Sequence, residues 1–464
     1  MPPDHAKSFG GGPQETSLTP YALVVLILAT ILILVLPRKY AALPLLLISF
    51  LVPVNQALVL GGTHFFVLRI VILAGLVSLI RGKPKTGPGA EVARYNAIDS
   101  AFTWCMVIQA VAVILLFKEM PAVINQAGFL IDNLGAYFLF RRLFQEPEDI
   151  YPALKFLAVV SVILAACMLV EQVRLLNVFG YVGGTRFAPE IREGKIRSMG
   201  PFLHELTAGC FAATLMPLFL MLWKNGKAKL PALIGIIGVT IMTVTSNSST
   251  PLLAYFAGLL GIGLWPLRRN MKSVRWGIVF GLAGLALIMK APIWFVIAHI
   301  DLTGGSSGYH RAVIIDQFIR HFSDWWLMGV KETGSWGWDL WDTQNQFVNV
   351  GETGGVVAFI LFLVMISRCF GRLGDARKAV QADPQQQWVL WFLGSALFAH
   401  VTAFFGVNYF DQSRVSWIML LAMISTVTAP ILARGQKAAE AEVVGSPIQY
   451  QQLKELSSLE SPPR

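Results

Sequence analysis

The chain has 464 residues, of which 55% are hydrophobic and 14% are charged, and its mean hydropathy is +0.60. Soluble domains carry about 25% charged residues, so this composition excludes a soluble globular enzyme, a disulfide-stapled secreted domain and a disordered chain. The formal net charge is +10. In a membrane protein a basic excess marks cytoplasmic loops, so we expect no nucleic-acid partner. The sequence predicts an all-α polytopic integral membrane protein.

Residues 1–19 are polar and rich in glycine and proline, which predicts a flexible N-terminal segment. Apolar runs long enough to cross a bilayer, some near the lower limit of about 17 residues, then follow at 20–37, 41–59, 64–80, 98–117, 122–140, 151–170, 202–223, 231–246, 250–266, 276–298, 346–368, 388–407 and 414–432. We therefore predict a transmembrane domain over 20–432 with about 12–13 helices. Twelve helices would place both chain ends in the cytoplasm. Residues 433–464 have the composition of a flexible cytoplasmic tail.

Basic residues give the orientation of these runs. They cluster in five connections, near residues 81–94, 141–142, 224–229, 268–275 and 368–378. If the runs alternate from residue 64 onward, all five clusters lie on one side, which the positive-inside rule assigns to the cytoplasm. The two long loops, 171–201 and 299–345, then lie on the outer side. Loops of this length are often functional, so we expect the chemistry there.

The first outer loop carries positive charge on the side where topology disfavours it. Between Glu171 and Arg197 it holds five basic residues against three glutamates. Arginine forks match phosphate oxygens, so an anionic ligand is one interpretation. Salt bridges with the same glutamates, or contact with lipid headgroups, are the alternatives. Arg197 is the strongest candidate, because the chain runs from it through His204 directly into an apolar span.

The second outer loop is acidic and aromatic. It holds five of the thirteen tryptophans; Trp336 lies within its glycine-rich stretch, Gly329 to Gly337, and Trp338 directly follows it. Indole rings pack on the apolar faces of sugars, so both are candidate glycan-binding residues. An interfacial aromatic belt is the alternative. Apolar residues at helical spacing predict an amphipathic helix over 309–323, with His310 and Arg311 near its start.

Polar residues within spans are functional candidates. Arg69 lies near the outer end of its span and could reach a lipid phosphate. Arg69 and the mid-span Asp132 could alternatively each pair with other buried charges. The serine-rich residues 245–251 predict a tight turn or a re-entrant bend between two spans. Walker, lipase-type and Rossmann motifs are absent from the sequence. Acidic pairs such as Asp339 and Asp342 are mostly solvated, so we expect no metal and no cofactor.

Several of these features occur in a recognisable order. Arg197-x-x-Gly-x-Phe enters a span, a serine-rich break follows, and a later loop holds an arginine-led helix, a glycine-rich stretch and Asn345 before Gly354. Over about 150–430 this order resembles the bacterial O-antigen ligase and polysaccharide polymerase superfamily. Members transfer glycans from an undecaprenyl-pyrophosphate carrier on the outer face of the inner membrane.

The resemblance implies a metal-independent, inverting glycosyltransferase with a periplasmic active face. Arg197 and Arg311 would grip the carrier pyrophosphate, and Asn345 would belong to the substrate-binding motif. Gln344 stands where many ligases have histidine, and glutamine cannot act as a general base. His310, Asp342 and Glu352 are the remaining candidate catalytic bases.

The implied function is polymerisation of O-antigen or exopolysaccharide repeat units. A ligase with a lipid or protein acceptor is the alternative. A lipid-linked glycan flippase without chemistry is a further one. The implied partners are the undecaprenyl-pyrophosphate-linked donor, a glycan or lipid acceptor, the lipid bilayer and other polysaccharide assembly proteins.

Overall fold

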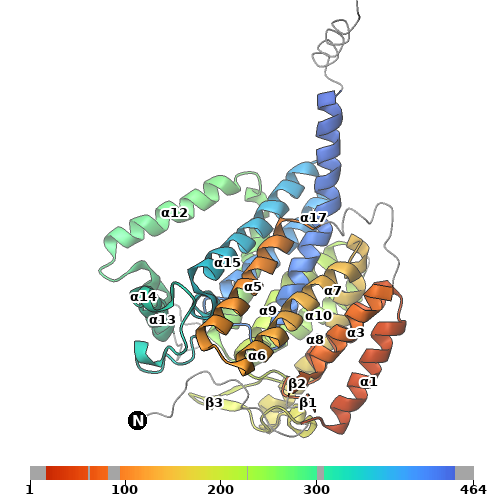
Figure 1. Ribbon diagram of the computed structural model, residues 1–464. Coiled ribbons are helices and arrows are strands. Elements are labelled where there is room, and N and C mark those ends of the chain that lie inside the picture. Colours follow the sequence, from red (N-terminus) through yellow and green to blue (C-terminus); the bar gives the residue numbers. More distant parts are fainter. Residues whose placement is uncertain (1–16, 61–62, 82–94, 227, 300–307, 445–464) are drawn as a thin grey trace, which may run out of the picture.

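A computed structural model describes residues 17–60, 63–81, 95–226, 228–299 and 308–444, which are almost entirely helical (Figure 1). The helices of the first half are α1 (Pro20–Val35), α2 (Ala42–Leu51), α3 (Val67–Arg81), α5 (Ala97–Phe117), α6 (Met120–Leu130), α7 (Ala136–Leu143), α8 (Ile150–Arg174) and α9 (Glu205–Lys224). Those of the second half are α10 (Lys229–Thr245), α11 (Ser249–Gly263), α12 (Met271–Ile288), α13 (Gly308–Arg320), α14 (Phe322–Trp325), α15 (Gln346–Ala379), α16 (Pro384–Ala403) and α17 (Ser413–Val444).

Two antiparallel hairpins complete the described structure. Strand β1 (Ala57–Leu60) pairs with β2 (Thr63–Phe66), and β3 (Glu190–Arg192) pairs with β4 (Lys195–Arg197). Both hairpins lie at the same end of the helical bundle, and α13 and α14 lie at its side, toward that end (Figure 1). We call this the hairpin end. The two loops predicted to lie on one side of a membrane therefore meet at one end of the molecule.

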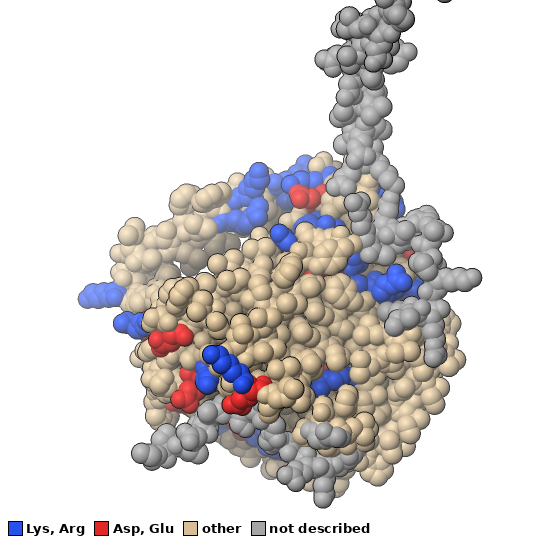
Figure 2. Space-filling view, viewed as in Figure 1, with Lys and Arg blue, Asp and Glu red and all other residues tan. Residues whose placement is uncertain are grey.

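The described helices are consistent with an all-α, multi-pass membrane protein. Six helical segments are long and apolar enough to cross a bilayer: Ala97–Phe117, Pro147–Arg174, Glu205–Lys224, Met271–Ile288, Gln346–Ala379 and Ser413–Gly435. On the face seen in Figure 2, lysines and arginines gather along the end opposite the hairpins. A broad band of mostly uncharged residues lies between that end and a mixed-charge patch near α13 and α14.

Most of the predicted apolar runs correspond to helical structure, but the run 41–59 is not a spanning helix. Helix α2 ends at Leu51, and Val52, which precedes Pro53, is extended. The helical conformation is disfavoured for a residue that precedes proline. Strand β1 begins five residues after Val52. The run 276–298 is also interrupted: α12 ends at Ile288, and a 3-10 helix covers Ile293–His299.

The ends of the chain differ from the prediction where they are described. Helix α17 continues to Val444, so the predicted flexible tail is helical over its first part. The alanines, glutamates and lysine between 433 and 444 are good helix formers. Near the N-terminus Ser17 pairs with Ala57, and Thr19 caps α1. The remainder of the two predicted flexible segments, 1–16 and 445–464, lies outside the described residues.

The core of the bundle is built around α9. Almost every residue of this helix is buried, and it packs against α8, α10, α11 and α16. Its first residue, Glu205, lies at the hairpin end, so the most constrained helix of the fold positions that glutamate. Helix α12 is the opposite case: none of its residues is buried, and it projects from the bundle (Figure 1).

Candidate functional site

Arg197 is positioned by the short hairpin β3–β4. The two-residue turn, Glu193 and Gly194, has positive φ angles of 52° and 75°, as a tight hairpin requires. In this register Glu190 lies opposite Arg197. The hairpin thus carries an arginine and a glutamate side by side, and the Arg197 side chain points inward, since only 6% of the residue is exposed.

The guanidinium of Arg197 joins three elements. Its Nη1 lies 3.2 Å from Glu190 Oε1 and 2.5 Å from Glu205 Oε1. Its Nη2 donates a hydrogen bond to Ser248 Oγ at 3.3 Å. Arg197 therefore forms a salt bridge with Glu190, a glutamate of its own loop, as one of the predicted alternatives had it. Its second carboxylate partner, Glu205, lies outside the loop.

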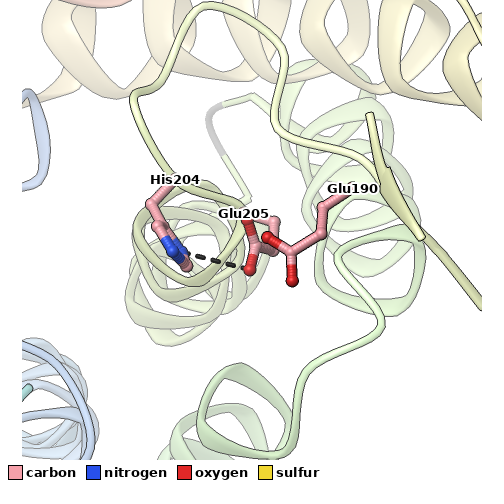
Figure 3. A group of neighbouring side chains, drawn as sticks. All are labelled: Glu190, His204 and Glu205. Atoms are coloured by element: carbon pink, nitrogen blue, oxygen red, sulfur yellow. Dashed lines mark ion pairs between the residues drawn. The ribbon is translucent and has the colours of Figure 1, made fainter. Parts of the chain in front are cut away.

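Glu205 and His204 form the floor of the same site. His204 is the N-cap residue of α9 and Glu205 is its first residue, fully buried at the positive end of the helix dipole. His204 Nδ1 lies 3.1 Å from Glu205 Oε1, while Glu190 reaches toward that carboxylate from the hairpin (Figure 3). Among the described residues, neither oxygen of the Glu205 carboxylate has a hydrogen-bond partner, and neither does His204 Nδ1, so the short distances to Glu205 are ion-pair contacts.

These three side chains have the spacing of a metal site. One ligand atom from each of Glu190, His204 and Glu205 lies within 4.8 Å of the others. The Arg197 guanidinium, however, already contacts both carboxylates. A divalent cation would have to displace it, because two cations cannot share this position without strong repulsion. The arrangement is therefore an arginine-centred site.

Arg311 reaches the hairpin end from α13 and is a buried cation. Only 9% of the residue is exposed, and its Nε has no hydrogen-bond partner. Within the described residues no carboxylate pairs with it. Burial lowers the pKa of Arg311 to about 10, and repulsion from Arg197 and Arg192 acts in the same direction. The group stays protonated at neutral pH, so the described part of the chain leaves this buried charge uncompensated.

Arg311 is close to the serine-rich turn through Gly406. A Cβ atom built on Gly406 would lie 3.1 Å from Arg311 Nε and in close contact with Thr250 Oγ1. The Thr250 hydroxyl is itself buried without a hydrogen-bond partner among the described residues. Arg311 Nε and the Thr250 hydroxyl, both without a hydrogen-bond partner among the described residues, thus lie close to the same residue, Gly406. Buried polar groups without partners are rare unless a ligand or an ion completes the arrangement.

The prediction of a tight turn at 245–251 is confirmed. Helix α10 ends at Thr245 and α11 begins at Ser249, with Asn247 in a left-handed conformation at φ 43°. Asn247 Nδ2 donates to the carbonyl of Ile196 at 2.6 Å, and Ser198 N donates to the carbonyl of Thr245 at 3.1 Å. These bonds fix the turn against β4, so Ser248 and Thr250 belong to the same site as Arg197 and Arg311.

Asn345 has a structural role that the sequence did not suggest. Its side-chain oxygen accepts hydrogen bonds from the backbone N–H groups of Phe347 and Val348, which caps α15. Its Nδ2 donates to the carbonyl of Phe405, next to Gly406. Asn345 therefore holds the start of α15 against the segment that contacts Arg311.

The three candidate bases occupy separate positions. His310 is half-buried at the start of α13, beside Arg311. Asp342 is half-buried in the loop before α15, where its Oδ2 accepts a hydrogen bond from Gln344 Nε2 at 3.3 Å.

Glu352, in the second turn of α15, is buried. It accepts hydrogen bonds from Thr343 Oγ1 at 2.7 Å and Asn349 Nδ2 at 3.4 Å. Glu352 also lines a cavity of about 130 Å³ together with Gln126 and Thr353. Most of the wall of this cavity is apolar, and Glu352 is its acidic lining residue.

The two predicted glycan-binding tryptophans differ in exposure. Trp336 is buried in a small apolar cluster with Phe318 and stacks on His321. Trp338, two residues later, is 91% exposed. Only Trp338 of the two has its ring free to pack against a sugar.

Arg69 is occupied by an internal ion pair. Its Nε and Nη2 donate to the two oxygens of Asp132 at 2.9 and 2.8 Å, and Nη1 donates to the carbonyl of His64. Asp132 lies in a π-helical turn, Ile131–Gly135, between α6 and α7. Arg414 shares this carboxylate at 3.7 Å. Arg69 therefore takes the buried-pair alternative, and it is not a member of the site around Arg311.

Two of the predicted residues, Arg197 and Arg311, thus meet at one place with His204 beside them. Sequence reasoning did not identify Glu205 as a partner of Arg197, and it treated the hydroxyls of residues 245–251, which include Ser248 and Thr250, as groups that could line a polar site or simply form a turn. The adjacency of Glu205 to His204 at the start of a span was the available signal for Glu205. No protein-family model matches this chain, and no curated protein sequence matches it either. The superfamily resemblance therefore remains a prediction.

Proposed function

We propose that this protein transfers a glycan from an undecaprenyl-pyrophosphate carrier to an acceptor on the periplasmic face of the inner membrane, and that it polymerises O-antigen or exopolysaccharide repeat units. The observation that carries the proposal is Arg311, a buried arginine with no counter-ion among the described residues. A pyrophosphate would supply the missing negative charge and accept hydrogen bonds from the guanidinium.

The proposed reaction is a single displacement at the anomeric carbon. The acceptor hydroxyl oxygen forms a bond to that carbon while the bond to the carrier phosphate oxygen breaks, which inverts the configuration. Negative charge develops on the departing pyrophosphate. Arg311 would stabilise it directly, since prepositioned cations lower such barriers. Arg197 stays paired with the buried Glu205 and would contribute hydrogen-bond donors to the pyrophosphate once Glu190 moves away. No metal is needed for this step.

The acceptor proton needs a base close to the pyrophosphate. We propose His204 for this role, because Glu205 contacts its Nδ1 at 3.1 Å and the same carboxylate contacts Arg197. A carboxylate on one ring nitrogen orients a histidine so that the other nitrogen can accept a proton. His310, Asp342 and Glu352 are the alternative bases. The exposed ring of Trp338 is the proposed glycan contact.

Polymerase is favoured over ligase by Gln344, which replaces the histidine found in many ligases. A ligase with a lipid or protein acceptor uses the same donor chemistry and remains the second candidate. Both the polymerase and the ligase would require the buried cation of Arg311 to stabilise the departing pyrophosphate. A flippase, which catalyses no transfer, would require no general base.

The test is a transfer assay with purified protein in detergent and a lipid-pyrophosphate-linked repeat unit. Arg311→Met should lower the rate at least 100-fold, as expected for loss of a charge-stabilising group. Arg320→Met is the matched control, because Arg320 lies on the same helix, is exposed and pairs with Asp316. We expect the control to stay within about twofold of wild type, as is usual for exposed ion pairs. Normal transfer by Arg311→Met would refute the proposal.

His204→Gln tests the proposed base in the same assay. Glutamine can keep a contact with Glu205 but cannot accept the acceptor proton. We expect a loss of at least 100-fold, within the range for general bases, and a loss of the corresponding limb of the pH–rate profile. If His204→Gln is active and one of the variants His310→Gln, Asp342→Asn or Glu352→Gln is not, the base is that residue.

A further inference from the structure

Three tryptophans gather at the end of the bundle opposite the hairpins. Trp265 follows α11, and Trp388 and Trp391 lie on the first turns of α16. The rings of Trp265 and Trp388 stack with centroids 3.8 Å apart, and Trp391 meets Trp265 edge-on at 5.7 Å. The indole N–H of Trp391 donates to the carbonyl of Gly261 at 2.8 Å, which fixes its orientation.

A cation lies over each of these rings. Lys224 Nζ is 4.3 Å from the centroid of Trp388, and Arg268 Cζ is 4.3 Å from that of Trp265. Arg377 Cζ is 5.9 Å from the centroid of Trp391. We call these six residues the Trp–cation cluster. Its cations come from the ends of α9, α11 and α15, so the fold brings them together from distant parts of the chain.

The cluster holds three positive charges without acidic partners among the described residues. Arg377 Nη2 donates to the backbone carbonyl of Arg268 at 2.8 Å, which places the two arginines side by side. Arg268 Nε is buried without a hydrogen-bond partner. The next residue along α15 is an ordinary case, since Lys378 pairs with Asp375 at 3.0 Å. Like charges held this close repel each other unless an anion lies between them.

Two exposed apolar residues border the Trp–cation cluster. Leu267, next to Arg268, and Trp223, next to Lys224, are both more than 40% exposed. Figure 2 shows the basic rim of this end above the uncharged band. A ligand that fits both features carries a phosphate for the cations and acyl chains for the exposed apolar residues.

We propose that the Trp–cation cluster binds the headgroup phosphate of an anionic phospholipid. Guanidinium and ammonium groups donate to the phosphate oxygens, and the indole rings hold the cations at the height of the headgroups. The positive-inside rule accounts for the number of basic residues at this end of the molecule. It does not account for three cations held on aromatic rings with no carboxylate nearby. The proposal does not depend on the transferase activity.

The test measures lipid retention by native mass spectrometry of the full-length protein in detergent. The probes are dioleoyl-phosphatidylglycerol, dioleoyl-phosphatidylcholine and inorganic phosphate, each titrated separately. The proposal expects saturable binding of phosphatidylglycerol and at least tenfold weaker binding of phosphatidylcholine. Arg268→Gln/Arg377→Gln should weaken phosphatidylglycerol binding about 30-fold, in line with two lost membrane-facing cations.

Lys272→Gln/Arg275→Gln is the matched control, since it removes two exposed charges from the neighbouring α12. It should weaken binding less than threefold by the same reasoning about screened surface charge. Lys224→Gln is a second site variant that alters no backbone contact, and it should weaken binding about fivefold. If the double variant does not fold, phosphatidylglycerol binding by Lys224→Gln tests the proposal in its place.

Three results would overturn the proposal. Equal loss in the control and site variants would mean a diffuse charge effect. Equal binding of phosphatidylcholine and phosphatidylglycerol by the wild-type protein would mean that charge does not select the lipid. Saturable binding of inorganic phosphate without retention of phosphatidylglycerol would assign the cluster to a free anion.

Discussion

The guanidinium of Arg311 is buried beside Thr250 and Gly406 with no counter-ion among the described residues. Burial lowers its pKa from the ordinary value of an arginine to about 10. This shift corresponds to an unfavourable contribution on the order of 3 kcal/mol to folding at neutral pH. Structural arginines are usually paired when buried. A destabilising arginine that the fold retains is therefore best explained by a ligand that pairs with it.

This reasoning makes a prediction about stability that is separate from activity. Arg311→Met removes the uncompensated charge and keeps the side-chain volume, so the ligand-free protein should melt at the same or a higher temperature. The gain should not exceed about 3 kcal/mol. Thermal unfolding in detergent measures it, with Arg320→Met as the control. A clear fall in melting temperature for Arg311→Met would mean that Arg311 has a structural partner instead.

Asn345 allows a second test at the residue scale. Asn345→Ala removes the cap of α15 and should cost about 1 kcal/mol of stability. Asn345→Asp keeps an oxygen that accepts the two backbone hydrogen bonds but loses the donation to the carbonyl of Phe405, so its stability should lie between those of Asn345→Ala and wild type, with transfer near wild type. The measurements are thermal unfolding and the transfer assay. A stable but inactive Asn345→Asp variant would show that the amide contacts the substrate, as the superfamily resemblance implies.

At this scale, sequence reasoning singled out Arg197 and Arg311, which the structure brings close to each other. Positive charge on the disfavoured side led to Arg197, and an arginine heading an amphipathic segment led to Arg311. It did not predict the partners of Arg197, because Glu205 and Ser248 come from other elements. Nor could it separate Trp336 from Trp338, since the burial of one ring depends on Phe318 and its neighbours.

At the scale of elements, the break in α15 connects the second loop to the membrane domain. Gly355 has φ 71° inside this helix, where the ladder of hydrogen bonds is interrupted. The loop enters the gap: Val356 N donates to the carbonyl of Trp326, and Val330 N donates to the carbonyl of Glu352, both at 2.8 Å. The position of Glu352 thus depends on a backbone conformation that favours glycine.

Gly355→Ala should therefore destabilise the protein and reduce transfer. The new Cβ would lie 2.5 Å from the carbonyl oxygen of Leu327, in a conformation that costs alanine about 1–3 kcal/mol before any clash. Gly371→Ala is the matched control on the same helix, because no atom lies within 4 Å of its added Cβ. The control should be neutral or slightly stabilising, by up to about 1 kcal/mol. Equal melting temperatures for the two variants would contradict this description of the break.

The elements themselves were largely predictable, because a span in lipid must be a helix with its backbone satisfied internally. The failures have identifiable causes. Pro53 ends the helical part of the run 41–59 early, and the chain turns into a hairpin. The π-helical turn at Asp132 is tied to its pair with Arg69, a contact 63 residues apart in sequence that no local pattern reveals.

At the scale of the whole molecule, the arrangement separates two chemistries. The hairpin end holds Arg197, Arg311, His204 and Glu205, where we propose that the carrier pyrophosphate binds. The opposite end holds the Trp–cation cluster. The positions of the basic clusters along the sequence predicted that the two ends of the molecule differ in charge. The convergence of the two loops on the start of α9 could not be anticipated, because it depends on how α9, α11 and α13 pack.

The most direct test of the central claim is the profile of lipid-linked glycans in cells that carry the wild-type gene, no gene, or the Arg311→Met variant. The proposal predicts that single repeat units accumulate on the carrier in the outer leaflet without the gene and with the variant, while polymer forms only with wild type. Long polymer stranded on the carrier would indicate a ligase. Repeat units confined to the cytoplasmic leaflet would indicate a flippase. Normal polymer made by Arg311→Met would contradict the role of the buried arginine.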